Sequence, residues 1–410
     1  MGTAGRPAPQ LSPFWGGATV QRDEARCRVG RCRVGAGSLR DGGSSPLEAG
    51  SQPVEVATQE GITREELQLA ARNHGMPLEA LRYPVTPVGL HYLLIHYDIP
   101  PVDPESFKLE IGGLVERPFS LTLDELSSRP AVELTVTMEC AGNGRATLTP
   151  RPVSQPWLLE AVGTARWRGT ALRPLLEEAG VFPGAVEVLF TGLDRGVEGG
   201  IEQWFQRSLP VDEAMRDEIL LAYEMNGQTL PPQHGAPLRL VVPGWYGMTN
   251  VKWLARIEVL ERPFDGYQQR AAYKLRQSEE DEGVAVGRML PRSLMVPPGK
   301  PEFLTRERFL GVEPVALEGK AWSGVGPIER VEVSADGGLS WAEAALGPDA
   351  DSPWAWRSWT YEWSPPAPGR YELCSRARDD AGNVQPVEPE WNLGGYANNA
   401  VQRVPVTITA

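Results

Sequence analysis

A stretch in the first half of the chain joins a strand pattern to a turn that holds a cysteine. Residues 134–139, Leu-Thr-Val-Thr-Met-Glu, alternate apolar and polar side chains, which predicts a strand buried on one face. The next residues, Cys140-Ala-Gly-Asn-Gly, are too rich in Gly and Asn to continue pairing and predict a tight, exposed turn. The guanidinium of nearby Arg145 would favour the thiolate, the form that binds metals or attacks substrates. The alternative is that Cys140 is a small apolar filler, the commonest fate of a free Cys.

Length and composition predict a globular chain of two or three domains. The chain has 410 residues, of which 41% are hydrophobic and 23% charged. Its formal net charge of -13 argues against nucleic acid and anionic membrane surfaces as partners. Four Cys and four His are too few and too scattered for a disulfide framework or a zinc ribbon. No run is long enough for a membrane-spanning helix, and neither a P-loop nor a Gly-rich nucleotide motif is present.

Residues 1–60 are predicted to be a disordered N-terminal extension. Most of this segment is rich in Gly, Arg, Ser and Pro and has no apolar periodicity. Cys27 and Cys32 have no further ligands nearby, which argues against a metal site. Without the apolar core of a secretory signal, the default location is cytoplasmic, and a periplasmic or exported location stays open.

Residues 61–285 mix strand patterns with short helices, which predicts an α+β domain with a mixed sheet. Thr63 and Glu66 form a predicted capping box, with Gly75 as the C-cap of that helix, and Thr170 is expected to cap a second helix that ends at Gly180. A further short helix is predicted at 121–126, and Asn226-Gly227 predicts a hairpin turn. The expected strands are 88–98, 107–113, 134–139, 186–191, 219–225, 237–243 and 251–259.

Residues 286–410 show strand patterns without helices, and about seven short strands predict an immunoglobulin-like sandwich. Asp336-Gly-Gly338 is a predicted hairpin turn. The band of Trp354, Trp356, Trp359 and Trp363 suits either inter-sheet packing or an interface. Cys374 is interpreted as a buried filler.

Several motifs, in order along the chain, resemble those of the sulfite oxidase family. In the first domain they are Cys140-Ala-Gly-Asn-x-Arg145, Trp157 with Thr164-Ala-Arg-Trp167, Tyr223-Glu-Met-Asn-Gly227, His234-Gly-x-Pro-Leu-Arg239 and Val251-Lys-Trp253. In the second they are Val331-x-Val-Ser-x-Asp-Gly-Gly-x-Ser-Trp341, Asn383-Val-Gln-Pro386 and Trp391-Asn-Leu, which resemble the family's dimerisation domain. The resemblance runs from about residue 80 to the end and implies a homodimer.

The resemblance also implies a molybdenum held by molybdopterin and by one Cys thiolate, which here is Cys140. Thiolate sulfur is a soft donor that suits such a metal. The implied cofactor contacts are Ile95, His96, Asp194, His234, Arg239, Asn250, Val251 and Lys252. Judged from local sequence alone, a His on a strand is more often structural, and Arg239 more often a solvated strand residue.

On the substrate side, the resemblance implies roles for Arg145, Trp157 and Tyr273. The implied activity is oxygen-atom transfer at sulfur, with sulfite or a related small sulfur compound as substrate and a separate electron acceptor such as a c-type cytochrome. Leu94 and Gly394 stand where the family's sulfite oxidases have Arg. Two lost charge-assisted contacts, each worth about 1.5–3 kcal/mol, would weaken anion binding by about a hundredfold or more. Either another Arg substitutes or the substrate is less anionic.

Two other functions stay open from the sequence. One is the reverse chemistry, a reductase of S-oxides or N-oxides within the same family. The other belongs to a different class, a cofactor-free binding protein that uses the sandwich domain to contact a partner.

Overall fold

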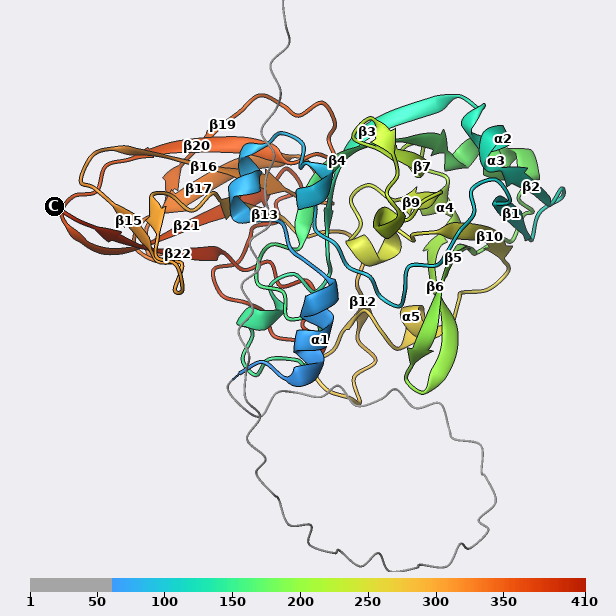
Figure 1. The fold of residues 1–410 in the computed structure, drawn as a ribbon, viewed down its shortest axis with the longest axis horizontal. Helices are drawn as coiled ribbons and strands as arrows, with labels where there is room; N and C mark the ends of the chain where they lie inside the picture. Colours follow the sequence, from blue (N-terminus) through green and yellow to red (C-terminus); the bar gives the residue numbers. More distant parts are fainter. Residues whose placement is uncertain (1–60) are drawn as a thin grey trace, which may run out of the picture. The chain divides into compact units, whose positions relative to one another are not determined.

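The computed structural model describes residues 61–410 (Figure 1). The predicted N-terminal extension, with Cys27 and Cys32, lies outside the described residues. No helix within 61–410 is long and apolar enough to cross a membrane.

The strand that leads to Cys140 belongs to an antiparallel sheet. The members are β3 (Ala131–Glu139), β4 (Val162–Ala171), β7 (Leu220–Met225), β8 (Gln228–Thr229) and β9 (Arg239–Val241), with β9 on β7. The β7–β8 turn is Asn226-Gly227, both with positive φ, as predicted. Beyond Thr135, β3 is buried on both faces instead of one. Its second face is contacted by the C-terminal half, since the Trp356 N–H donates to the Thr137 hydroxyl at 2.8 Å.

A second sheet has the order β2-β1-β10-β5-β6. The bounds are β1 (Lys108–Gly113), β2 (Phe119–Thr122), β5 (Glu187–Glu198), β6 (Ile201–Pro210) and β10 (Leu254–Leu260). β1 and β10 pair in parallel and the other neighbours pair antiparallel, which confirms the mixed sheet. A small hairpin of β11 (Lys274–Leu275) and β12 (Val284–Ala285) follows.

The helices of this half are short. They are α1 (Arg64–Arg72), α2 (Leu123–Ser127), α3 (Leu172–Ala179), α4 (Val211–Ala214) and α5 (Tyr267–Arg270). The Thr63/Glu66 capping box and the Gly180 cap are confirmed. Three details differ from prediction. The C-cap of α1 is Asn73 rather than Gly75, and α2 begins at Leu123 after β2. Thr170 does not cap α3, because its hydroxyl donates to the Leu126 carbonyl.

The apolar run 88–98 is not the predicted strand. It begins as a 3₁₀ helix (Val88–Leu90) and continues as irregular backbone, with one β-bridge between His74 and Leu93. Its backbone groups form hydrogen bonds with side chains and not with a neighbouring strand. The Leu94 carbonyl accepts from Lys252 Nζ at 2.7 Å, and the Ile95 N–H donates to Asn73 Oδ1 at 2.7 Å. The remaining 3₁₀ helices are Leu78–Arg82, Arg145–Thr147, Pro232–His234 and Gly247–Thr249.

The C-terminal half is all-β, as predicted, with two sheets. One is β13 (Arg292–Met295), β16 (Val315–Trp322), β20 (Arg357–Trp363) and β19 (Ala345–Leu346), in that order. The other is β14 (Lys300–Pro301), β15 (Arg308–Leu310), β22 (Gln402–Ile408), β21 (Gly369–Asp379), β17 (Ile328–Ser334) and β18 (Ala342–Glu343). One apolar core contains side chains from both sheets, among them Leu317, Trp359 and Leu373. Asp336-Gly-Gly338 lies in the loop between the antiparallel strands β17 and β18. The strands of this half that were missed from the sequence are the four-residue β13 and the two- and three-residue strands, which are too short to show a pattern.

The members of the tryptophan band pack in two different cores. Trp359 and Trp363 belong to the core of the C-terminal half. Trp356 instead packs in the core of the first half, where its Nε1 donates to the Pro84 carbonyl at 2.8 Å. Cys374 is a free, fully buried thiol in β21, in agreement with a filler role.

Candidate functional site

Cys140 follows directly after β3, as predicted, but its turn is buried rather than exposed. Every residue from Cys140 to Arg145 is buried. A segment of the C-terminal half covers the turn. The Ala397 N–H donates to the Ala141 carbonyl at 2.7 Å, and Asn398 Nδ2 donates to the Gly144 carbonyl at 2.8 Å. The turn that carries the thiol is therefore held by residues far away in sequence.

Burial raises the pKa of the Cys140 thiol, and the Arg145 guanidinium only partly opposes this effect. Arg145 thus favours the thiolate, as expected from the sequence, but burial has the larger effect on the free thiol. A metal bound to the sulfur would itself supply the charge that deprotonates it.

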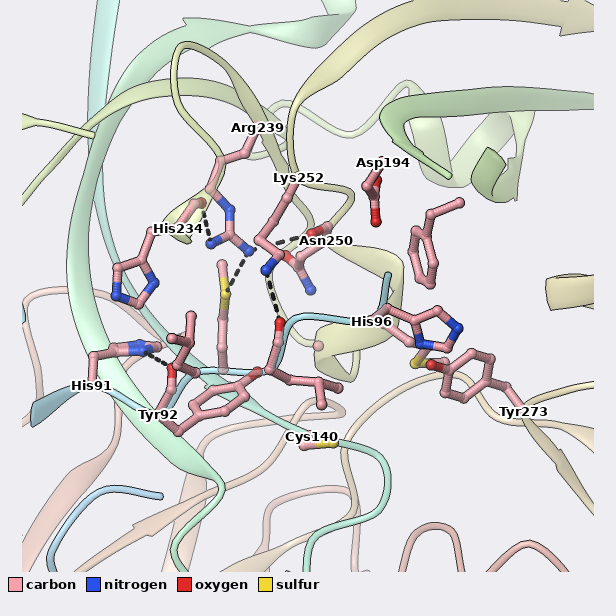
Figure 2. A pocket seen from close by; sticks show the side chains of 16 residues that line it. His91, Tyr92, His96, Cys140, Asp194, His234, Arg239, Asn250, Lys252 and Tyr273 are labelled. Carbon is pink, nitrogen blue, oxygen red and sulfur yellow. Dashed lines mark hydrogen bonds between the residues drawn. The ribbon is translucent and has the colours of Figure 1, made fainter. Parts of the chain in front are cut away.

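Two pockets meet at Cys140. The first, here the basic pocket, is lined by His234, Arg239, Asn250, Lys252 and Asp194 (Figure 2). The second, here the aromatic pocket, is lined by Arg145, Trp157, Glu198 and Tyr396. Leu94, His96, Cys140 and Tyr273 line both pockets. A group bound at the sulfur would thus be reached from two sides by different sets of side chains.

Arg239 supplies a buried positive charge to the basic pocket. Its side chain begins β9 and is only 5% exposed, so the solvated-strand interpretation is wrong. Nη1 donates to the His234 carbonyl at 3.0 Å, and the guanidinium lies 4.6 Å from the ring centroid of Trp167. Burial lowers the pKa of Arg239 to about 10, which leaves it charged at neutral pH. Among residues 61–410, no carboxylate forms an ion pair with it.

Lys252 and Asp194 have pKa values shifted in opposite directions. Burial lowers the pKa of Lys252, whose Nζ donates to the carbonyls of Leu94 and Gln233. Burial raises the pKa of Asp194, although Lys252 opposes this shift. Asp194 was expected to lie outside its strand, which was predicted to end at residue 191. It lies instead within β5, where the pairing with β6 is interrupted between Thr191 and Arg195.

Two neutral histidine rings lie beside Arg239. Burial lowers the pKa of His234 to about 2 and that of His91 to about 4. The rings meet edge to face, with centroids 5.5 Å apart. His91 was not predicted to bind the cofactor, although the sequence placed it in the same run as His96. Its Nδ1 contacts the Tyr92 carbonyl at 3.0 Å, and its Nε2 is buried without a hydrogen-bond partner in the described part of the chain.

The other predicted cofactor residues do not all reach the basic pocket. The side-chain amide of Asn250 lines it but is already engaged with the Val242 N–H and the Tyr246 carbonyl. Val251 is fully buried in the core and lines neither pocket. Ile95 lines only the aromatic pocket. Asn250 and Val251 are therefore placed to shape the loop rather than to contact a ligand with free polar groups.

His96 is at the junction of the two pockets. Its Nε2 lies 2.8 Å from Glu198 Oε2, and the same carboxylate oxygen accepts from Gln268 Nε2 at 2.7 Å. Neither Glu198 nor Gln268 was predicted from sequence. No local pattern marks them, because their positions depend on how the β5–β6 hairpin and α5 approach the 88–98 segment.

The aromatic pocket brings together the three predicted substrate residues. Arg145 is 4% exposed, and its Nε donates to the Gly394 carbonyl at 2.9 Å. Trp157 and Tyr273 are also buried. Tyr396, which was not predicted, packs against Tyr273 with centroids 5.2 Å apart. Position 394 thus offers a backbone carbonyl that orients Arg145, where an arginine side chain was expected from the resemblance.

The basic pocket fits an anionic group with polar edges bound beside a thiol. Arg239 Nε, Asp194 Oδ1 and His91 Nε2 are buried without hydrogen-bond partners among residues 61–410. Buried polar atoms normally have hydrogen-bond partners, so a bound ligand would supply the partners that these donors and acceptors lack. The cations suit a phosphate, the remaining groups suit the edges of a polar ring, and the Cys sulfur suits a soft metal.

Comparisons with known proteins agree with this arrangement. Residues 96–268 match the family model "Oxidoreductase molybdopterin binding domain", and residues 286–409 match the "Mo-co oxidoreductase dimerisation domain". Mitochondrial sulfite oxidase of Homo sapiens is 37% identical over 79% of this chain, which spans 62% of the length of that relative. The chain belongs to the sulfite oxidase family.

Other members of the family differ in their reactions. An NADH nitrate reductase of Brassica napus is 32% identical over 79% of this chain, which spans 38% of that protein. The crystal structure of the sulfane dehydrogenase SoxCD from Paracoccus pantotrophus superposes with a TM-score of 0.71 at 27% identity and covers 87% of this chain and 90% of its own. The cofactor of the family is molybdenum-molybdopterin, and the residues of the basic pocket fit it.

Proposed function

We propose that the protein oxidises sulfite or a related small sulfur compound. The observation that carries this proposal is the position of Cys140, which lies at the junction of a cation-rich pocket and a pocket lined by Arg145, Trp157 and Tyr273. One side suits the cofactor and the other a small oxyanion. Oxidation adds one oxygen atom, taken from water, to sulfur and releases two electrons and two protons.

Arg239, Lys252 and His234 hold the cofactor, and Cys140 is the protein ligand of its metal. Arg239 and Lys252 provide charge-assisted donors, and neutral His234 provides one ring N–H and one acceptor nitrogen. When bound, molybdenum-molybdopterin supplies a centre that exchanges an oxygen atom and two electrons with the substrate. Separate carriers then remove the electrons, and a c-type cytochrome is the proposed acceptor.

The aromatic pocket binds and orients the substrate. Arg145 is a buried cation that attracts an oxyanion, and its hydrogen bonds to the carbonyls of Gly394 and Gln155 fix its direction. Burial raises the pKa of Tyr273 well above its ordinary value, so its hydroxyl stays protonated and can donate to a substrate oxygen. Trp157 is buried and lines the same pocket.

The second candidate is a reductase of S-oxides, N-oxides or nitrate. The relationship to a nitrate reductase favours it, and the absence of arginine at positions 94 and 394 suits an uncharged S-oxide or N-oxide. A cofactor-free binding protein would not need the unsatisfied polar atoms of the basic pocket.

Elemental analysis and assays in both directions separate these functions. The purified protein is expected to contain about one molybdenum per chain and to reduce ferricyanide or cytochrome c when sulfite is added. Reduced viologen with nitrate or dimethyl sulfoxide tests the reverse reaction. Activity in the reducing direction alone would contradict the proposed oxidation and support the reductase. A purified protein without molybdenum would contradict both functions.

We further propose that residues 286–410 form an immunoglobulin-like domain that builds a homodimer, with the domain boundary near residue 285. The match to a dimerisation domain over 286–409 supports this proposal.

A further inference from the structure

Four side chains form a continuous stack along the substrate side of the site. The Arg145 guanidinium lies 5.0 Å from the ring centroid of Tyr396, and the Tyr396 ring packs 5.2 Å from that of Tyr273. On the far side, the Arg207 guanidinium lies 5.5 Å from the Tyr273 ring centroid. Two cations thus bracket two phenol rings, an arrangement that strengthens a phenol as a hydrogen-bond donor.

Arg207 is the unexplained member of this stack. It belongs to β6, is 2% exposed, and its Nε is buried without a hydrogen-bond partner. The one hydrogen bond of its guanidinium within residues 61–410 runs from Nη1 to the backbone carbonyl of Gln268. No carboxylate in that part of the chain forms an ion pair with it, and Glu187 attracts it only from a longer distance.

A buried cation without a counter-ion is costly, since desolvation is not offset by a partner. Burial lowers the pKa of Arg207 only to about 10, so the group stays charged at neutral pH. Within residues 61–410 no carboxylate pairs with this charge, so a bound anion would be favoured nearby. Tyr273 lies between Arg207 and the aromatic pocket, which is where a bound anion would be.

We propose that Arg207 substitutes, from behind Tyr273, for the arginines that are absent at positions 94 and 394, and so makes the substrate of this enzyme a sulfur oxyanion. This inference rests on the proposed function and deepens it. Arg207 is a positioning residue. Its charge strengthens the Tyr273 hydroxyl as a hydrogen-bond donor. It also attracts the substrate anion across the Tyr273 ring, where little water screens the charge, while Arg145 and Tyr396 contact the opposite side of the pocket.

Anion binding without turnover tests the inference on the molybdenum-loaded protein. Calorimetric titration with sulfate measures affinity for an oxyanion, and dimethyl sulfone serves as an uncharged probe of similar shape. We expect Arg207→Met to weaken sulfate binding about tenfold or more and to leave sulfone binding within about twofold. Arg207→Lys should restore sulfate affinity to within about threefold, because it keeps the charge.

Arg195→Met is the matched control. Arg195 lies on the same β5–β6 hairpin and also stacks on an aromatic ring, that of Trp204 at 5.2 Å, but its side chain is 60% exposed. Its removal should leave sulfate affinity unchanged. In a Tyr273→Phe background, the effect of Arg207→Met should shrink, a coupling that a purely structural role of Arg207 would not produce.

The inference is overturned if the wild-type protein does not bind sulfate, if Arg207→Met binds sulfate as the wild type does, or if sulfate and sulfone affinities fall together. Should Arg207→Met fail to fold, Arg207→Gln replaces it, since an amide retains a donor for the Gln268 carbonyl without the charge. These titrations involve no catalysis. If sulfate affinity depends on Arg207 but the protein oxidises no sulfur compound, the proposed function is wrong and the inference about anion binding still holds.

Discussion

At the residue scale, burial fixes the protonation of the groups around the cofactor side of the site. His234 lies among Arg239, Lys252 and His91, so both desolvation and neighbouring charge disfavour its cationic form. The ring is therefore neutral and presents one donor and one acceptor. A cofactor with a phosphate and a polar ring can use both, while the cations beside it supply the charge.

The depressed pKa of His234 predicts how the stability of the cofactor-free protein depends on pH. Its pKa is about 2 in the folded protein and 6.5 as an unperturbed group. Between these values the unfolded state binds more protons than the folded state, so stability falls as pH drops below about 6.5. In His234→Gln this contribution disappears. The difference in unfolding free energy between wild type and variant, measured in denaturant from pH 7.5 to 5, should shrink as pH falls.

His74→Gln is the control for that experiment, because His74 is exposed and lies outside the pocket. Its stability should follow the wild type across the same pH range. A constant difference between wild type and His234→Gln would contradict the neutral buried ring.

Sequence reasoning found those site residues that a local motif marks, and it missed those that only packing assembles. Cys140, His234 and Arg239 lie in recognisable motifs, and the structure brings all three to one pocket. Tyr396 and Arg207 have no such signal. Their roles depend on a segment from the C-terminal half and on the outer strand β6, whose approach to Tyr273 cannot be derived from spacing along the chain.

At the scale of elements, a buried ion pair joins β3 to the C-terminal half beside the cysteine. Arg292 Nη1 of β13 donates to Glu139 Oε1 at 2.6 Å, and Trp322 Nε1 of β16 donates to Oε2 at 2.9 Å. Both members of the ion pair are 1% exposed. Glu139 directly precedes Cys140, so the strand end that presents the thiol is anchored by both halves of the molecule.

Arg292→Met is expected to destabilise the protein by about 3–5 kcal/mol, because it leaves Glu139 buried without a counter-ion. Denaturant unfolding measures the change. Arg82→Met removes the exposed pair with Glu318, whose side chains are 52% and 46% exposed, and should cost no more than about 1 kcal/mol. Equal effects of the two substitutions would show that the buried pair has no special role in holding the strand.

The elements that local chemistry specifies were predicted best. Capping residues defined the start of α1, Gly180 defined the end of α3, and Asn226-Gly227 defined a hairpin. The 88–98 run failed because its apolar pattern predicted a strand, whereas its backbone groups bind side chains such as Lys252 and Asn73. Such long-range hydrogen bonds have no signature in the segment itself.

At the scale of the whole molecule, the C-terminal half contributes directly to the site. Arg145 donates to Gly394, and Tyr396 packs on Tyr273. Sequence patterns predicted an α+β half followed by an all-β half, both of which the fold contains. They did not predict that the second half covers the Cys140 turn, because that cover depends on tertiary contacts between distant segments.

The proposed homodimer predicts a mass about twice that of the 44.9 kDa chain. Sedimentation equilibrium across a range of protein concentrations measures it directly. A species that remains at the monomer mass at micromolar concentration would contradict the dimer without affecting the assignment of Cys140.

Metal content in a single cysteine variant shows whether the Cys140 sulfur binds the molybdenum. Cys140→Ser, purified in parallel with the wild type, should lose molybdenum about tenfold or more, since the metal loses its protein ligand. Cys374→Ser, at a buried free thiol far away in sequence, should retain it. Wild-type molybdenum content in Cys140→Ser would contradict the assignment of this sulfur as the ligand and, with it, the account of the site.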